Sequence, residues 1–184
     1  ATLTINDTPD ALVVEGVVIN NNAVQRSRVT VLEVTLNGVV PNTPANKAAI
    51  TVQNRQTLAN VGLGYTFDYS TPGKTKITLS FTGVETEFGS LKDGNYQLNI
   101  GAGLTHAGGT LGSAFTYGGV AGHKFYRLFG DADGNRTINS IDYNALLASF
   151  GSNDPKFDIN MSGTVDSVDY NALLVRFGST LVFA

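Results

Sequence analysis

The chain has 184 residues, of which 42% are hydrophobic and 15% are charged, and it contains no cysteine. Disulfides, thiolate nucleophiles and cysteine-ligated zinc are therefore excluded, and no apolar run is long enough to span a bilayer. Residues 1–127 carry eight acidic and nine basic side chains, whereas residues 128–184 carry seven and three, so a basic stripe is absent and we expect no nucleic-acid binding.

The first 105 residues are typical of short β-strands. Val, Ile, Thr and Leu are concentrated in "ALVVEGVVIN", "RVTVLEVTLNG", "KAAITVQN", "KTKITLSFTG" and "NYQLNIG", and turn residues separate these runs. In the second run Leu32, Val34 and Leu36 share one face, which we predict to be the core face. This pattern predicts an immunoglobulin-like β-sandwich domain over residues 1–122.

The next segments predict a connection and a junction. Residues 101–122 contain too much glycine for a regular element, so we expect a long connection there. The junction "HKFYRLFGD" then supplies Phe125, Tyr126, Leu128 and Phe129 instead of a flexible spacer. These side chains are expected either to belong to the core of a C-terminal module or to pack that module on the sandwich, and both can hold together.

Two related segments follow the junction. "GDADGNRTINSIDYNALLASFG" begins at residue 130, and "FDINMSGTVDSVDYNALLVRFG" begins at residue 157, with "DYNALL" repeated at an offset of 27 residues. A calcium ion takes six to eight oxygen ligands, and a twelve-residue loop supplies them from positions 1, 3, 5, 7, 9 and 12, with a backbone carbonyl at position 7. The expected ligands of the first loop are Asp131, Asp133, Asn135, the Thr137 carbonyl, Asn139 and Asp142. Those of the second are Asp158, Asn160, Ser162, the Thr164 carbonyl, Asp166 and Asp169.

The all-oxygen ligand sets favour two calcium ions over softer metals. The alternative is that the Asp and Asn residues form metal-free turns that open two helices. Ile138 and Val165, at position 8 of each loop, are expected to pair with each other in a short strand contact. Position 6 is Arg136 in the first loop and Gly163 in the second. Because a residue other than glycine is strained at positive φ, we expect the first site to be strained or weaker.

A helix is predicted after each loop but not before it, and position 12 is Asp rather than the Glu of an EF-hand. With these features, the region from about Phe129 to Phe177 resembles a dockerin domain, a duplicated calcium-binding loop-helix module with two F-hand loops. The resemblance implies a small all-α dockerin-like module over residues 123–184 and a cohesin-like protein domain as its partner.

The family's contact face consists of residues just before each helix and a pair further along it. Carried over to this sequence, the partner-binding face consists of Ser140, Ile141, Leu147, Ala148, Ser167, Val168, Leu174 and Val175. These residues are mostly apolar, so we expect a cover for them, either a cohesin-like partner or the chain's own β-sandwich.

The search for catalytic residues yields none. His106 and His123 lack nucleophilic partners in sequence, and Glu85 and Glu87 are more typical of solvated acids near a turn than of a glycosidase pair. We therefore expect a non-catalytic calcium-binding attachment unit of an exported bacterial protein, extracellular or at the cell surface. The chain begins at Ala1 rather than Met, which we expect of a processed form or an excised fragment. The alternatives are an accessory region that binds polysaccharide, favoured by an exposed aromatic row, and a calcium-stapled surface protein without a cohesin partner.

Overall fold

A computed structural model describes residues 11–183 of the chain. The first ten residues of the expected sandwich domain lie outside this range. The strands are β1 (Val14–Ile19), β2 (Val31–Leu36), β3 (Ile50–Asn54), β4 (Asn60–Asp68), β5 (Thr75–Thr82), β6 (Thr86–Glu87), β7 (Ser90–Leu91), β8 (Gly94–Ile100), β9 (Thr105–His106), β10 (Gly109–Thr110), β11 (Phe115–Gly118) and β12 (Tyr126–Arg127). The helices are α1 (Pro44–Ala48), α2 (Ser140–Ser149) and α3 (Ser167–Leu174), with 3-10 turns η1 (Asn20–Asn22) and η2 (Ala121–His123).

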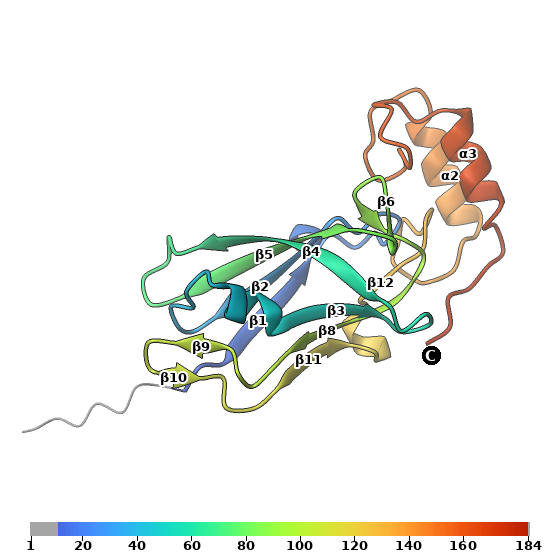
Figure 1. The fold of residues 1–184 in the computed structure, drawn as a ribbon. Coiled ribbons are helices and arrows are strands. Elements are labelled where there is room, and N and C mark those ends of the chain that lie inside the picture. The colour runs from blue at the N-terminus through green and yellow to red at the C-terminus, as the bar shows by residue number, and fades with distance from the viewer. Residues whose placement is uncertain (1–10, 184) are drawn as a thin grey trace, which may run out of the picture.

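The main sheet is antiparallel and curls into a nearly closed, barrel-like shape (Figure 1). Its strand order is β1-β2-β5-β4-β3-β8-β11, and β12 pairs with β8 outside this path. The sheet folds into two layers, which are joined where β3 pairs with β4 at Val52↔Val61 and Gln53↔Asn60. Leu32, Val34 and Leu36 are fully buried between the layers, as the alternation in β2 predicts.

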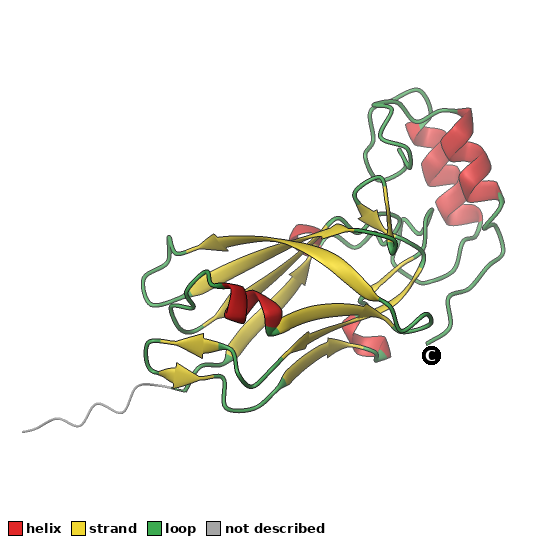
Figure 2. Ribbon diagram, in the orientation of Figure 1, coloured by secondary structure: helices red, strands yellow, loops and turns green. Residues whose placement is uncertain are grey.

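The expected fold class is wrong as a whole. A β-sandwich fits the sheet, although its two layers belong to one continuous sheet, but no all-α module follows it. Among the described residues after His123, helix is confined to α2 and α3, and most of the segment is loop (Figure 2). The physical reason is that loops and turns, including the two calcium-loop stretches, make up most of this segment, while the junction extends as β12 and pairs with β8 through Tyr126↔Asn95.

The hydrophobic core is divided at the junction. Phe125 belongs to the core of the sheet unit, which we define as residues 11–125. Tyr126, Leu128 and Phe129 belong to a second cluster, with Leu146 of α2 and Leu173 of α3. This second cluster forms the core of residues 126–183, which we call the loop unit. The four apolar junction residues are therefore all buried, on both sides of the boundary.

The two units are also joined by polar contacts. The backbone N–H of Arg26 donates to the Asp131 carbonyl at 2.8 Å, and that of Leu128 donates to the Arg26 carbonyl at 3.0 Å. The Arg28 guanidinium donates to the Asp158 carbonyl at 2.6 Å. Residues 26–28 of the sheet unit thus contact position 1 of both loops, and the loop unit is fixed on the end of the sheet.

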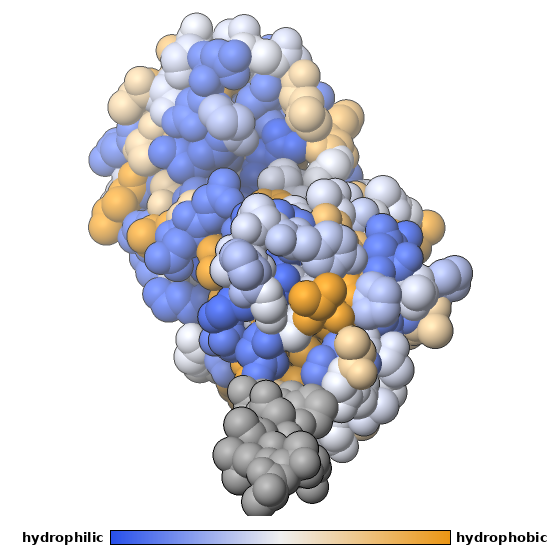
Figure 3. Space-filling view, turned by 90° about the vertical axis from the view of Figure 1, so that its left-hand side faces the viewer, coloured by the Kyte–Doolittle hydropathy of each residue, from blue (hydrophilic) through white to orange (hydrophobic). Residues whose placement is uncertain are grey.

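One face of the loop unit can be seen beyond the sheet unit. Viewed from the opposite end of the molecule, the loop unit presents mainly hydrophilic side chains, with apolar ones toward its flanks (Figure 3). Between residues 11 and 183, none of the helices has both the length and the apolar character needed to cross a membrane.

Candidate metal centre

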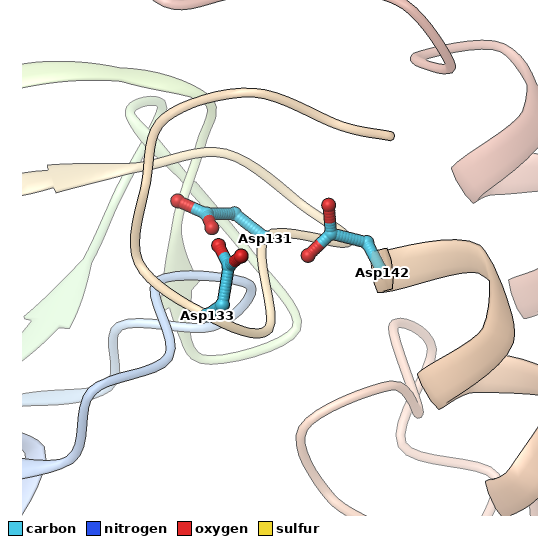
Figure 4. A group of neighbouring side chains, drawn as sticks. All are labelled: Asp131, Asp133 and Asp142. Atoms are coloured by element: carbon cyan, nitrogen blue, oxygen red, sulfur yellow. The ribbon is translucent and has the colours of Figure 1, made fainter. Parts of the chain in front are cut away.

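The first loop, residues 131–142, brings three carboxylates together. Oxygen atoms of Asp131, Asp133 and Asp142 all lie within 4.8 Å of one another. Asp131 and Asp133 come from the start of the loop, and Asp142 points toward them from the first turn of α2 (Figure 4). Two oxygens bound to one calcium at about 2.3–2.6 Å are at most about 5 Å apart. The cluster therefore has dimensions and donor chemistry that fit a calcium ion.

Hydrogen bonds from the backbone fix these carboxylates. Asp142 accepts from the N–H of Ala132 at 2.8 Å through one oxygen and from that of Asn139 at 3.0 Å through the other. Asn139 in turn accepts from the N–H of Ile141, which completes a capping box at the start of α2. Each carboxylate oxygen has two acceptor sites, so one backbone donor leaves a lone pair for a cation. Positions 9 and 12 thus start the helix and remain able to act as ligands.

Asp131, at position 1, is fully buried and accepts four hydrogen bonds. The N–H groups of Gly134 and Asn135 donate to Oδ1, while the N–H of Arg136 and the hydroxyl of Tyr126 donate to Oδ2. Burial raises the pKa of the Asp131 carboxyl, and these hydrogen bonds oppose that shift. Each oxygen of Asp131 thus already has two donors, so a cation bound here would have to share or displace one of them, and it would favour the charged form of the carboxyl further.

The second loop, residues 158–169, repeats this arrangement. Asp158 accepts from the N–H of Ser162 at 2.9 Å and from that of Gly163 at 2.8 Å. Asp169 accepts from the N–H of Ile159 at 2.7 Å and from that of Asp166 at 2.8 Å, as Asp142 does in the first loop. The two loops therefore share the hydrogen bonds at positions 9 and 12 and those from positions 5 and 6 to position 1, whereas Asp131 also accepts from position 4, at Gly134, and from Tyr126.

The remaining expected ligands lie within the same two loops. Asp133, Asn135 and Asn160 each accept from the N–H two residues further on, which is an Asx-turn. The Ser162 hydroxyl donates to the Thr164 carbonyl at 3.0 Å. Such turns are also what a metal-free loop would contain. The convergence of three carboxylates in the first loop is the feature that favours a cation, because like charges at this distance repel.

The position-8 residues pair differently from the expected contact. Ile138 and Val165 are both buried, but Ile138 exchanges hydrogen bonds with Gly178 and Ser179. Val165 exchanges the equivalent bonds with Gly151 and Ser152. Each loop therefore pairs with the residues that follow the other repeat's helix. The pairing expected between Ile138 and Val165 is wrong, because the crossed arrangement already satisfies their backbone groups.

Left-handed backbone conformations occur at positions 4 and 6 of both loops. Arg136 has a φ of 73°, as expected for position 6, but Met161 at position 4 of the second loop has a φ of 57°. Gly134 and Gly163 hold the remaining two positions. Each loop thus contains one strained non-glycine residue, at a cost of roughly 1–2 kcal/mol. Because both loops carry such a residue, the backbone strain at Arg136 does not by itself make the first site the weaker one.

The two loops have glycine at different positions, and the reason lies in the contact with the sheet unit. A Cβ atom at Gly134 would lie 2.3 Å from the Val24 carbonyl oxygen, so position 4 of the first loop must be glycine. Met161, at the equivalent place in the second loop, is 63% exposed and meets no such constraint. Sequence reasoning missed this difference because it depends on a contact between residues 110 positions apart.

The eight residues of the expected partner face are all exposed. Val175 is 84% exposed, and Ile141 and Val168 are more than half exposed. Two shallow hollows of about 330 and 280 Å³ lie along α2 and α3, and Tyr170 lines both. The sheet unit leaves this face uncovered.

The acidic residues considered for catalysis serve other contacts. Glu85 accepts hydrogen bonds from Asn54 and Thr57, whereas Glu87 pairs with Arg127. The two carboxylates therefore have separate hydrogen-bond partners. His123 stacks on Tyr117 with ring centroids 4.4 Å apart and accepts from the N–H of Gly118.

The aromatic residues of β4 pack inward. Tyr65 and Phe67 contact the sheet core, and the hydroxyl of Tyr65 donates to backbone carbonyls of Lys47 and Ile50. Tyr69 is partly exposed, with its hydroxyl bonded to the Val40 carbonyl. Of these three side chains only Tyr69, which follows β4 and stacks on Phe67, is exposed, so this stretch offers one exposed ring rather than the row that would favour polysaccharide binding.

In comparisons with known proteins, no protein-family model, no curated protein and no solved structure matches this chain.

Proposed function

We propose that this chain is a non-catalytic calcium-binding interaction unit, in which two calcium ions order the loops that carry α2 and α3. The observation that carries the proposal is the convergence of Asp131, Asp133 and Asp142 within 4.8 Å, in a loop whose hydrogen bonding is repeated 27 residues later. Without a cation, these carboxylates would repel one another. The resemblance to dockerins, which belong to exported bacterial proteins, is the ground on which we propose a location outside the cell or at a bacterial cell surface.

Calorimetry with calcium alone tests the stoichiometry. We expect two ions per chain, and one ion for each of the variants Asp133→Ala and Asn160→Ala, which change position 3 of one loop. Both side chains are at least partly exposed and bond only within their own loop, so the variants should fold. Asp68→Ala, which removes a surface carboxylate from β4, should still bind two ions. Folded wild-type protein that binds no calcium would contradict the proposal.

The uncovered face of α2 and α3 supports docking as the role of the loop unit. Its apolar side chains are exposed beside the two hollows, and the sheet unit does not use them. The resemblance to dockerins implies that the partner is a cohesin-like domain. The alternative in which calcium only stabilises the fold of a surface protein does not account for this uncovered apolar face.

Binding to cohesin domains with and without calcium tests this part of the proposal. We expect calcium-dependent binding that Val175→Asp weakens at least tenfold, because a charge would be desolvated in the interface. Val84→Asp is the matched control, since Val84 is 77% exposed on the sheet unit. Equal effects of the two variants would place the docking surface elsewhere.

A further inference from the structure

Arg136 occupies a loop position that favours glycine, and its side chain reaches out of the loop. With a φ of 73°, its backbone is in the left-handed region. The guanidinium lies between two aromatic rings, 4.2 Å from the centroid of Tyr126 and 3.2 Å from that of Phe183. Nη1 donates to Asn95 Oδ1 at 3.0 Å and lies 3.3 Å from the Leu181 carbonyl oxygen. Arg136 therefore connects the first loop to β8 and to the C-terminal segment.

Asn95 holds the same segment from the sheet unit. Its side chain is buried, with one amide hydrogen donated to the Val182 carbonyl at 2.7 Å and its oxygen accepting from Arg136. The C-terminal segment, residues 179–183, also pairs directly with the first loop, because the Leu181 N–H donates to the Arg136 carbonyl at 2.9 Å. In Figure 1 this segment leaves α3 and returns to the end of the sheet.

Tyr126 links this cluster to the expected calcium ligand. Its ring stacks under the Arg136 guanidinium, and its hydroxyl donates to Asp131 Oδ2 at 2.6 Å. The backbone N–H of Arg136 donates to the same oxygen at 3.1 Å. A continuous chain of contacts thus runs from Asn95 through Arg136 and Tyr126 to position 1 of the first loop.

The second loop has no such support among the described residues. At the 27-residue offset, Tyr126 corresponds to Asn153 and Arg136 corresponds to Gly163. Oδ2 of Asp158 accepts only the backbone N–H of Gly163, at 2.8 Å. The repeats thus provide the same ligands in different surroundings.

We propose that Tyr126 and Arg136 are positioning residues of the first loop, which make it the tighter of the two calcium sites and fasten residues 179–183 to it. This inference rests on the proposed calcium binding. Ligands that are held before binding lose less conformational freedom when the ion binds, and hydrogen-bond partners of ligating carboxylates typically change metal affinity by 10–100-fold. Arginine at the glycine position is then explained, since its contacts offset the backbone strain.

The affinity difference can be read one site at a time, with calcium as the only ligand. The first site is measured alone in the variant Asn160→Ala, and the second site is measured alone in the variant Asp133→Ala. With no other substitution present, the first site should have the lower dissociation constant for calcium. Tyr126→Phe removes only the hydroxyl and should weaken the first site about tenfold or more while leaving the second unchanged. Tyr143→Phe is the matched control, because its hydroxyl contacts Tyr170 and no loop ligand. Equal affinities of the two sites, or equal losses at both, would overturn the proposal.

Hydrogen exchange in chelator tests the fastening without calcium. Arg136→Gly relieves the backbone strain, so a purely local role predicts slower or unchanged exchange. We expect instead faster exchange at the Leu181 and Ile138 amides, which bond across the C-terminal segment, with the Val165 amide unchanged. Met161→Gly is the control in the second loop. Unchanged exchange at Leu181 would refute the fastening of residues 179–183. If the wild-type protein binds no calcium, the proposed function fails, but this exchange measurement in chelator still tests the fastening.

Discussion

Replacing Arg127 by methionine should strongly destabilise the chain, because this arginine is fully buried where the two units meet. Its Nη1 pairs with Glu87 and with Asp93 at 2.8 Å, and its Nε donates to the Ser27 carbonyl at 2.8 Å. Asp93 also pairs with Arg176, which follows α3, at 2.5 Å. Arg127 therefore joins residues 26–28, the β6-β7 hairpin and the loop unit.

The magnitude follows from what the substitution leaves behind. Removing one partner of a buried ion pair typically costs 3–5 kcal/mol, because the other charge remains without compensation. Here the side chains of Glu87 and Asp93 are each 28% exposed, and Asp93 keeps Arg176 as a partner. In addition, within residues 11–183, Nη2 of Arg127 has no hydrogen-bond partner, which lowers the benefit of the native arginine. We therefore expect a loss of about 3 kcal/mol, the lower end of that range.

Urea unfolding in the presence of calcium measures this loss, with thermal melting as a second readout. For a chain of this length, 3 kcal/mol corresponds to a fall in Tm of roughly 6–12 °C. Lys76→Met is the matched control, because Lys76 also lies near two carboxylates but its side chain is 45% exposed. Surface pairs contribute about 1 kcal/mol or less. A loss below 1 kcal/mol for Arg127→Met, or one equal to that of the control, would refute the argument that the buried network fixes the units together.

Three further outcomes follow from the same contacts. Chelation should lower Tm in a single transition rather than two, because residues 26–28 bind both loops; calorimetric melting that resolves a separate early transition would contradict this. Gly134→Ala should destabilise the chain more than Gly163→Ala in urea, since both sites have positive φ but a Cβ meets the Val24 carbonyl only at the former; equal losses would speak against a tight contact. Met161→Gly should stabilise the chain by roughly 0.5–1 kcal/mol, because relief of roughly 1–2 kcal/mol of left-handed strain exceeds the entropic cost of glycine, and a loss of stability would show that this backbone is not strained.

The strands show where sequence patterns suffice and where they fail. Strict alternation identified the buried face of β2, because side-chain direction in a strand has a period of two. β4 was missed, since Gly62 and Gly64 weaken the strand signal. Both glycines allow close pairing with β5: a Cβ at Gly64 would lie 2.4 Å from Ser80 Oγ. The weak signal therefore comes from glycines in β4 whose reason, close contact with β5, is not visible in the sequence of β4 itself.

The prediction of an all-α module at the C-terminus relied on its two helices alone. The helix starts were clear, because Asn139 and Asp166 are N-cap residues followed by Asp at the third position. Irregular backbone makes up most of the segment, and β12 and the two loops contact β8 and residues 26–28. Hydrogen bonds such as that from Arg28 to Asp158 span 130 residues, which no local pattern encodes.

The duplication itself predicts two equivalent loops, and the environment makes them different. Residues 26–28 contact position 1 of each loop, but through a backbone N–H at Asp131 and through a buried guanidinium at Asp158. The sheet unit approaches only the first loop closely enough to require Gly134, and there it also receives the Arg136 side chain. A repeated sequence therefore fixes the spacing of the proposed ligands in both loops, whereas the asymmetric contact with the sheet decides how firmly each proposed ligand set is held.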